Sequence, residues 1–456
     1  MRPEAQSPES AYCQEHFGSI WLQRWNAVAE LDCVPPATPH GAGHASRVIC
    51  RRRHDEHMPA ASAPHSLCDL ENVVIDPSLA PRAPCPRHRP GYMCTSRTYH
   101  RYDPGSFRVR CAWGGGAFNA SRYSRDHGRD IFEAVSAGAD ASEDVTQAPT
   151  AASLPTLLVT REIHEHANLY HTLTDLLNAH VTLRVLGWTR WSVLLMDDHP
   201  AGGMDEFWAR LEAAGRGEAV GEAAAVGGGR RPTRFLRAAV PPPGYSSLLF
   251  AHLYEDNSCA ENTELFRGFR LFILELFGIR DKGGRDGGAS LKELSTKGAA
   301  PAPLRMTVIS RRLGPKRRRL ARRIANEDAL LAALRSLGPL DGRSVEAELV
   351  DMGALSLGAQ LRLVQQTDLL VGMHGAGLAH ALLARPGSAL LELWPQRDGI
   401  WRCYEHFAEW AGLEYGRWAN PDPGRHRKDG SGDLTTVDEV AVARLAEELL
   451  RRVAAR

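Results

Sequence analysis

The sequence predicts an α/β protein organised around a parallel β-sheet, and one stretch carries the prediction. An apolar run at 369–371 has the length and composition of a buried strand. A glycine-rich loop at 372–377 follows it, and the apolar segment 378–383 can start a helix. Arg-Pro-Gly at 385–387 ends that helix, and 389–393 is typical of the next strand. Strand, glycine loop, helix and strand together form one unit of a doubly wound fold.

The first half of the chain alternates short apolar runs with amphipathic segments. Strands are predicted at 157–160 and 192–196, with a helix between them from 169 to about 185. An amphipathic helix is predicted at 264–277. The stretch 281–303, rich in glycine and proline, is typical of a linker.

The second half repeats this alternation after the linker. The apolar runs and helical periodicity there predict strands at 306–310 and 345–350 and helices at 326–337, 357–366, 401–411 and 437–453.

Composition and charge narrow the class of protein. The chain has 456 residues, 43% hydrophobic and 24% charged, as in globular proteins of two or three domains. Its net charge of +1 creates no global field that would favour nucleic acid or a membrane surface. No apolar run approaches the ~20 residues of a membrane helix. We therefore expect no nucleic-acid partner and no stable membrane span in this sequence.

The cysteines indicate the secretory pathway. Seven of the nine fall in the first quarter of the chain: Cys13, Cys33, Cys50, Cys68, Cys85, Cys94 and Cys111. Their spacing is wide and includes no C-x-x-C, which argues against zinc and favours disulfides. The N-terminus lacks a basic and apolar signal, and the C-terminus is not an ER-retention tetrapeptide. We expect a lumenal protein whose signal peptide is not visible in this sequence.

The glycine loop has the chemistry of a ligand site. Three glycines within six residues cost backbone entropy, but they let the backbone approach a ligand closely. The following helix start offers unpaired N–H groups to a phosphate, and His374 could add a donor. Glu392, at the tip of the next strand, could accept the hydroxyls of a ribose. A tight turn with a buried histidine is the alternative, and no NAD-type or ATP-type glycine pattern occurs.

The same loop resembles a known family. Gly-Met-His-Gly-Ala-Gly-Leu-Ala-His at 372–380, followed by a strand that ends in Glu-Leu-Trp, is similar to the donor-binding signature of glycosyltransferase family 61. Within that family it most resembles the EGF-domain-specific O-linked N-acetylglucosamine transferases. The resemblance implies a GT-B fold with two Rossmann-like lobes and a cysteine-rich N-terminal section.

The resemblance also implies a division of the chain. The expected parts are a cysteine-rich section at 1–112, an acceptor-side lobe at 113–280, a linker at 281–303 and a nucleotide-sugar-binding lobe at 304–456.

An activity follows from the resemblance. It implies inverting transfer of N-acetylglucosamine from UDP-GlcNAc to Ser or Thr hydroxyls of a folded, secreted EGF-like domain, in the lumen of the endoplasmic reticulum. A pentosyltransferase that uses UDP-xylose on glycans, and a non-catalytic relative, are the alternatives. No cofactor or metal is required beyond the UDP-sugar donor.

The catalytic residues are expected in the first lobe. Asn168, His171 and Asp175 lie at i, i+3 and i+7, so one helical face presents all three. They match the Asn-x-x-His-x-x-x-Asp pattern of the family. The resemblance implies that His171 or Asp175 is the general base. A helix cap followed by a structural His–Asp pair is the alternative.

The donor-binding residues are expected in the second lobe. Arginine suits diphosphate oxygens, and the resemblance implies that Arg311 and Arg323 contact them. His374 and Glu392 join them, with the loop residues Gly375, Ala376, Gly377 and Leu378. The basic run at 310–324 could instead indicate nucleic-acid binding, but it has no interleaved aromatic residues.

A metal site is a further alternative near the first lobe's helix. His164, His166 and His171 could hold zinc, although they lack cysteine partners and a helical His-x-x-x-His pair. We expect no metal site.

Overall fold

The computed structural model describes residues 8–27, 29–34, 45–53, 65–76, 105–110, 112–113, 135–137, 154–161, 168–197, 202–218, 232–251, 263–281, 301–312, 320–396, 401–430 and 432–456. The chain divides into two units. One, here the C-terminal unit, contains the described residues up to Gly18 and those from Thr263 onward; the other, the N-terminal unit, contains those from Ser19 to Ala251.

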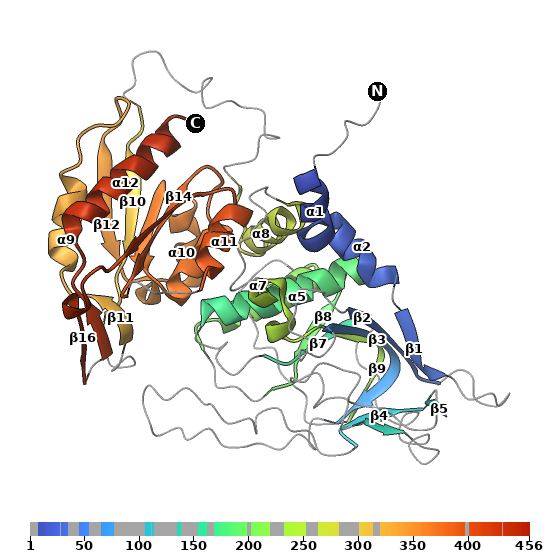
Figure 1. Cartoon of the computed structure of the whole chain (residues 1–456). Coiled ribbons are helices and arrows are strands. Elements are labelled where there is room, and N and C mark those ends of the chain that lie inside the picture. The colour runs from blue at the N-terminus through green and yellow to red at the C-terminus, as the bar shows by residue number, and fades with distance from the viewer. Residues whose placement is uncertain are drawn as a thin grey trace, which may run out of the picture. The chain divides into compact units, whose positions relative to one another are not determined.

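A five-stranded parallel sheet is the centre of the C-terminal unit (Figure 1). Its order is β12 (Val345–Val350), β10 (Leu304–Ile309), β13 (Leu369–Met373), β14 (Ala389–Trp394) and β15 (Glu414–Ala419). All four pairings are parallel. Every residue of β13 and β14 is buried, because helices cover both faces of the sheet.

Helices α9 (Glu327–Arg335) and α12 (Glu439–Ala454) pack on one face of this sheet. Leu369, Val371 and their neighbours on β14 join these helices in one hydrophobic core. The other face is covered by η7 (Ala376–Leu383) and α11 (Cys403–Trp410), with α10 (Leu357–Val364) packed on η7. Residues alternate between the faces of a strand, so Glu392 lies on the η7 side, opposite Leu391.

The helix expected after the glycine loop is a 3₁₀ helix, η7, rather than an α-helix. A backbone bond three residues apart fits this tighter coil: the Leu378 N–H donates to the Gly375 carbonyl oxygen over 2.8 Å. The strand before the loop and the strand after it are confirmed as β13 and β14.

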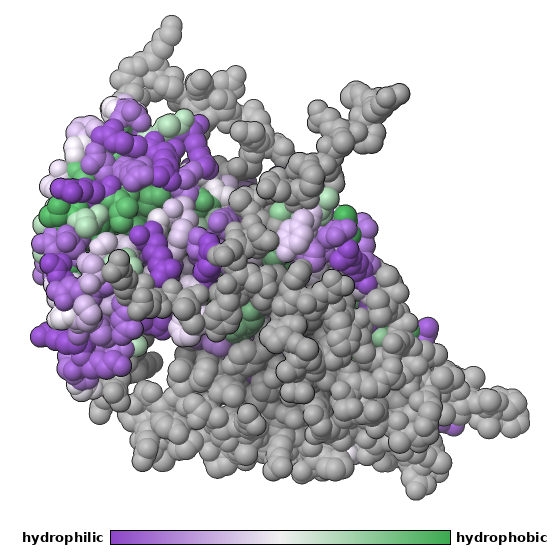
Figure 2. All heavy atoms as spheres, in the orientation of Figure 1, coloured by the Kyte–Doolittle hydropathy of each residue, from purple (hydrophilic) through white to green (hydrophobic). Residues whose placement is uncertain are grey.

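Smaller elements complete the C-terminal unit. They are η6 (Met352–Ala354), η8 (Pro423–Arg425) and a three-stranded sheet of β11 (Leu320–Ile324), β17 (Gly432–Thr435) and β16 (His426–Asp429). Figure 2 shows mostly hydrophilic residues on the face of this unit that the view presents.

Two more helices belong to this unit, α1 (Pro8–Phe17) and α8 (Glu264–Leu276). Phe17 of α1 is fully buried, with its ring 5.6 Å from that of Trp410. Phe266 of α8 stacks on the same Trp410 at 4.2 Å. The first helix of the chain therefore contributes to a core made by its second half.

The N-terminal unit is built on a nine-stranded mixed sheet. Its main order is β5 (Ala112–Trp113), β1 (Ala29–Val34), β2 (Arg47–Arg53), β3 (His65–Ile75), β9 (Thr233–Val240), β7 (Thr156–Val159) and β8 (Ser192–Leu195), with β4 (Phe107–Val109) paired to β3 and to β6 (Val135–Ala137). Its helices are α2 (Ser19–Ala27), α5 (Leu169–Leu186), α6 (Asp205–Arg216), η5 (Gly244–Ser246) and α7 (Leu248–Ala251).

Strands β7, β8 and β9 form a parallel part of this sheet, and the cysteine-bearing strands continue it. Strand β3 joins the two parts through an antiparallel ladder with β9. The α/β class is thus confirmed, whereas the GT-B arrangement and the division at residues 112, 280 and 303 stay predictions.

Disulfides occur among the N-terminal cysteines, as expected. Cys50 and Cys68 are bonded directly across the β2–β3 ladder, and Cys13 is also disulfide-bonded. Cys403, in the C-terminal unit, is a free and buried thiol. None of the described helices has the length and apolar character needed to cross a membrane.

Candidate functional site

Two strands of the C-terminal unit end at the same edge of its sheet. The glycine loop leaves the carboxyl end of β13, and Arg311 follows the carboxyl end of β10, its neighbour. In open α/β sheets, ligands bind at this edge. The structure therefore brings His374 and Arg311, both predicted to bind the donor, to the same edge of the sheet.

Glu392 and Tyr415 hold His374 in a hydrogen-bonded chain. His374 Nδ1 lies 2.5 Å from Glu392 Oε1, and the Tyr415 hydroxyl donates to Glu392 Oε2 over 2.6 Å. Glu392 is fully buried. Both of its oxygens are thus occupied inside the protein, so this geometry does not favour the ribose contact that the sequence suggested.

Aromatic side chains surround the imidazole of His374. Its ring centre lies 4.0 Å from that of Trp394, 5.7 Å from Trp401 and 5.0 Å from Tyr404. Only 3% of His374 is exposed. Burial lowers the pKa of His374, the hydrogen bond and charge of Glu392 oppose this, and the positive charges of Arg322 and Arg311 add to it. Burial thus favours the neutral ring, and the donor-binding role of His374 stays a prediction.

Gly375 makes room for Arg311. Its φ is 149°, outside the region that side chains favour, and a Cβ there would collide with the Arg311 guanidinium. Arg311 Nη1 also donates to the carbonyl of Ala321 over 2.8 Å. The glycine therefore lets a guanidinium group lie against the backbone of the loop, with Ala376, Gly377 and Leu378 just after it.

The second basic residue of the site is Arg322, one position before the predicted Arg323. Arg322 is close enough to lower the pKa of His374, and it has the same influence on Tyr404. In the part of the chain that the structure describes, its guanidinium makes no ion pair or hydrogen bond. Arg323 instead lies 3.6 Å from Asp429 on the small sheet.

The backbone explains why the side chains of Arg322 and Arg323 lie in different surroundings. The pairing of β11 with β17 shifts register between Leu320 and Arg323, and Arg322 has a left-handed φ of 60°. Such a bulge redirects one side chain, and strained φ values cluster at functional sites. Both arginines could be identified as candidates from the sequence, but the bulge that separates them could not be predicted.

A second histidine of the loop is buried deeper. His380 Nδ1 faces the Gly377 carbonyl, and its Nε2 lies 2.9 Å from Gln360 Oε1. Complete burial lowers the pKa of His380 to about 4, against the smaller opposing effect of its contact with the Gly377 carbonyl. His380 thus holds the loop in place as a neutral side chain.

The predicted catalytic residues lie on α5 of the N-terminal unit. Asn168 is the N-cap: its side chain accepts from the Tyr170 N–H over 3.0 Å. The His171 ring packs on Phe250 at 5.4 Å, and Asp175, one turn further, is buried. Asn168 therefore caps the helix, and the catalytic roles of Asn168, His171 and Asp175 stay predictions.

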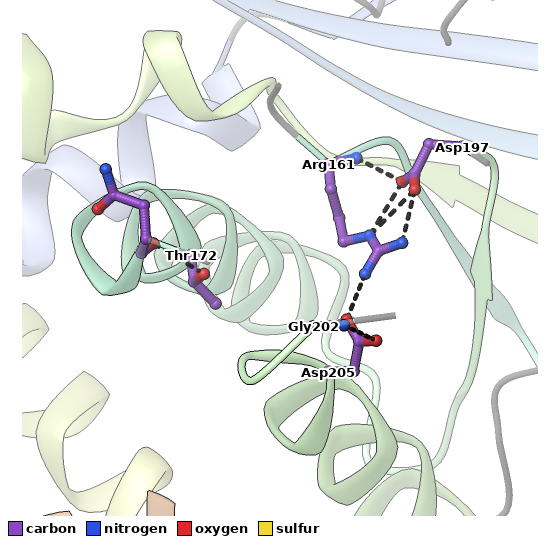
Figure 3. Close-up of polar contacts among 6 residues, drawn as sticks. Arg161, Thr172, Asp197, Gly202 and Asp205 are labelled. Atoms are coloured by element: carbon purple, nitrogen blue, oxygen red, sulfur yellow. Dashed lines mark hydrogen bonds and ion pairs between the residues drawn. The ribbon is translucent and has the colours of Figure 1, made fainter. Parts of the chain in front are cut away.

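Beside them lies a charged clamp that sequence reasoning missed (Figure 3). Arg161, just after β7, binds Asp197, just after β8, through its backbone N–H at 2.8 Å and its guanidinium at 2.7 Å. Its Nη1 also donates to Asp205, at the start of α6, over 2.6 Å. Figure 3 shows the guanidinium between the two carboxylates. The sequence signal was an arginine and an aspartate, each two residues beyond a parallel strand.

Some predicted positions lie outside the described residues. They are His164 and His166 of the alternative metal site, and the basic residues 313–319. Within the described ranges, no group of three or more His, Cys, Asp or Glu side chains is placed to hold a metal ion.

Comparisons with known proteins agree with the family resemblance seen in the glycine loop. Residues 235–391 match the family model Glycosyltransferase 61. The chain is 31% identical to the EGF domain-specific O-linked N-acetylglucosamine transferase of Mus musculus, over 37% of this chain and 28% of that protein. It is 26% identical to the Beta-1,2-xylosyltransferase RCN11 of Oryza sativa subsp. japonica, over 90% of this chain and 75% of that protein.

The chain is also similar to a second plant xylosyltransferase. The Beta-1,2-xylosyltransferase of Arabidopsis thaliana is 28% identical over 57% of this chain and 51% of that protein. The chain thus spans less than a third of the mouse relative but most of the rice one. The family match, over residues 235–391, includes the loop, its preceding strands and Arg322, and this part of the chain is therefore similar to glycosyltransferase family 61.

Proposed function

We propose that this protein is an inverting glycosyltransferase that moves N-acetylglucosamine from UDP-GlcNAc to Ser or Thr hydroxyls of a folded EGF-like domain. One observation carries the donor half of the proposal: Arg311 and Arg322 lie beside the glycine loop at the carboxyl edge of a parallel sheet. Guanidinium groups and loop N–H groups suit a diphosphate. The similarity to the mouse transferase supports the choice of sugar and acceptor.

The chemistry follows from these groups. The acceptor oxygen attacks the anomeric carbon, and the bond from that carbon to the UDP oxygen breaks with inversion. His171 or Asp175 takes the proton of the acceptor hydroxyl. Arg311 and Arg322 stabilise the charge that develops on the leaving diphosphate, a role that a metal has in other enzymes. The reaction proposed here needs no metal.

A second candidate is transfer of xylose from UDP-xylose to a glycan. The resemblance to the rice xylosyltransferase extends over 90% of this chain, far more than the resemblance to the mouse protein. Long coverage favours a shared architecture, while the higher identity over a short stretch favours a shared donor site. A non-catalytic relative is the third possibility, and the test below distinguishes it from the two transferases.

The proposed location is the lumen of the endoplasmic reticulum. The Cys50–Cys68 bond and the disulfide of Cys13 support an oxidising compartment.

The test is a panel of UDP-sugars with a folded EGF-like domain or a glycan as acceptor, each with and without a chelator. Transfer from UDP-GlcNAc to the EGF-like domain is expected in both conditions. Transfer of xylose to the glycan alone would select the second candidate. If UDP gives no shift in thermal unfolding and no sugar is transferred, the protein is a non-catalytic relative. Loss of transfer with chelator would contradict the metal-free reaction.

A further inference from the structure

The hydrogen bonds of Glu392 fix where the imidazole of His374 carries its hydrogen. Glu392 accepts the Tyr415 hydroxyl at Oε2 over 2.6 Å and faces His374 Nδ1 with Oε1 at 2.5 Å. Burial raises the pKa of Tyr415, so its hydroxyl keeps the hydrogen that it donates. A carboxylate only accepts hydrogen bonds, so Nδ1 must hold a hydrogen. A neutral ring in this tautomer has its lone pair on Nε2.

The surroundings of the ring favour this neutral form. Burial lowers the pKa of His374, the bond to the carboxylate opposes this, and the charges of Arg322 and Arg311 add to it. Trp394 packs on the imidazole at 4.0 Å, and the guanidinium of Arg417 in turn lies over Trp394 at 4.6 Å. Apolar packing and neighbouring cations therefore both disfavour a second hydrogen on the ring.

Nε2 is the polar atom of this ring that remains for a ligand. The side chain of His374 is only 4% exposed, and across the described stretches no hydrogen bond engages Nε2. A polar atom buried without a partner is unfavourable in free energy, and in folded proteins such atoms are few. His374 directly precedes Gly375, whose backbone lies against the Arg311 guanidinium. A ligand at the glycine loop would therefore meet a fixed hydrogen-bond acceptor there.

We propose that Glu392, itself held by Tyr415, is a positioning residue that keeps His374 an acceptor, and that His374 Nε2 accepts a hydrogen bond from a hydroxyl of the nucleotide sugar. This inference rests on the proposed function, because it requires a UDP-sugar at the glycine loop. Ionised phosphate oxygens are acceptors only, so they cannot bind a lone pair. The ribose and the sugar flank the diphosphate, and both carry hydroxyls that can donate to Nε2.

Nuclear magnetic resonance of the full chain with nitrogen-15-labelled histidine reads the tautomer, because ring nitrogens with and without hydrogen differ widely in chemical shift. His374→Phe identifies the signals of this ring. We expect hydrogen on Nδ1 and a lone pair on Nε2 in the unmutated protein. Hydrogen on Nε2, in a neutral or a protonated ring, would overturn the inference and leave the proposed function standing.

Glu392→Leu tests the positioning role with the same spectra. The variant removes the acceptor from Nδ1, so the ring should move toward the tautomer with hydrogen on Nε2, which a free imidazole side chain prefers. A merely structural Glu392 would not change the tautomer, so an unchanged tautomer in the folded variant would contradict its positioning role.

Calorimetry measures the hydroxyl contact. His374→Phe should bind UDP-GlcNAc about fivefold more weakly, the loss of one neutral hydrogen bond. His426→Phe, the matched control on the small sheet, should bind as the unmutated protein does. If the hydroxyl belongs to the sugar, UDP should bind to His374→Phe and to the unmutated protein equally. If it belongs to the ribose, UDP should lose the same factor, and either 2′-deoxy-UDP or 3′-deoxy-UDP should bind both proteins equally.

Two results separate this inference from the proposed function. Equal binding of UDP-GlcNAc to His374→Phe and to the unmutated protein would overturn the hydroxyl contact alone, and so would an equal loss with UDP and both deoxynucleotides. Absence of binding by UDP-GlcNAc and UDP-xylose to the unmutated protein would overturn the inference and the proposed function together.

Discussion

The glycine loop of the C-terminal unit and the strand edge of the N-terminal unit use their polar side chains differently. At the strand edge, Arg161 is fully engaged by Asp197 and Asp205, and Asn168 caps its own helix. Beside the glycine loop, Arg322 is a partly buried cation with no ion pair among the described residues, and His374 has one ring nitrogen unbonded. We expect the first arrangement to stabilise the fold and the second to leave a cation and a ring nitrogen available to a ligand.

The largest effect is expected where the polar groups hold the fold. Arg161→Ala leaves the buried Asp197 without its guanidinium partner and should cost about 3–5 kcal/mol in the free energy of unfolding, measured in urea. Arg210→Ala, which breaks a partly exposed i,i+4 pair with Glu206, should cost at most about 0.5 kcal/mol. The affinity for UDP should stay unchanged in both variants. A large loss of UDP affinity in Arg161→Ala would break the comparison.

Acid sensitivity should come from a buried histidine in each region. Burial lowers the pKa of His380 to about 4 and that of His180, on α5, to about 3. Both stay neutral in the fold but become charged in the unfolded chain, whose histidine pKa is about 6.5. Stability is thus fully present above pH 6.5 and lost as pH falls toward 4, by about 3 kcal/mol for His380.

The measurement is the free energy of unfolding from pH 7 to pH 4. His380→Gln should remove the part of this pH dependence that His380 contributes. His180→Gln should remove the contribution of His180 independently. Equal slopes in the variants and the unmutated protein would show that these rings are not the titrating groups.

Two neighbouring glycines sharpen the donor-site half of the comparison. Gly375→Ala introduces a strained φ and a clash with Arg311, at about 1–3 kcal/mol, and should weaken UDP binding at least tenfold. At Gly377 the nearest atom to an added Cβ is Ile309 Cγ2, at an ordinary 3.5 Å. Gly377→Ala should therefore bind UDP within about twofold of the unmutated protein. Thermal shift with UDP compares the pair, and equal losses would contradict the role of Arg311.

The smallest effect distinguishes two adjacent arginines. Arg322→Ala should weaken UDP binding by about 1.5–2 kcal/mol, the strength of a hydrogen bond to a charged group. Arg323→Ala removes the 3.6 Å contact with the half-exposed Asp429 and should change affinity little. The reverse order in calorimetry would restore the assignment made from the sequence.

Sequence reasoning found what is local and missed what depends on pairing between distant strands. The apolar runs and the glycine loop are continuous segments, so β13, β14 and the residues 374–378 could be located directly. Arg322 could not be preferred over Arg323, because a bulge against β17 separates them. The bond from Tyr415 to Glu392 likewise depends on the register of β15 beside β14. The ladder of β3 with β9 joins segments more than 150 residues apart.

The position of α1 has a practical consequence. Because the ring of Phe17 packs beside the stacked rings of Phe266 and Trp410, a deletion of the first eighteen residues would remove part of a core formed by the second half of the chain. Such a deletion would open a cavity against the helix that carries Tyr404, next to His374. A shortened protein that no longer binds nucleotide would therefore say nothing against the glycine loop itself.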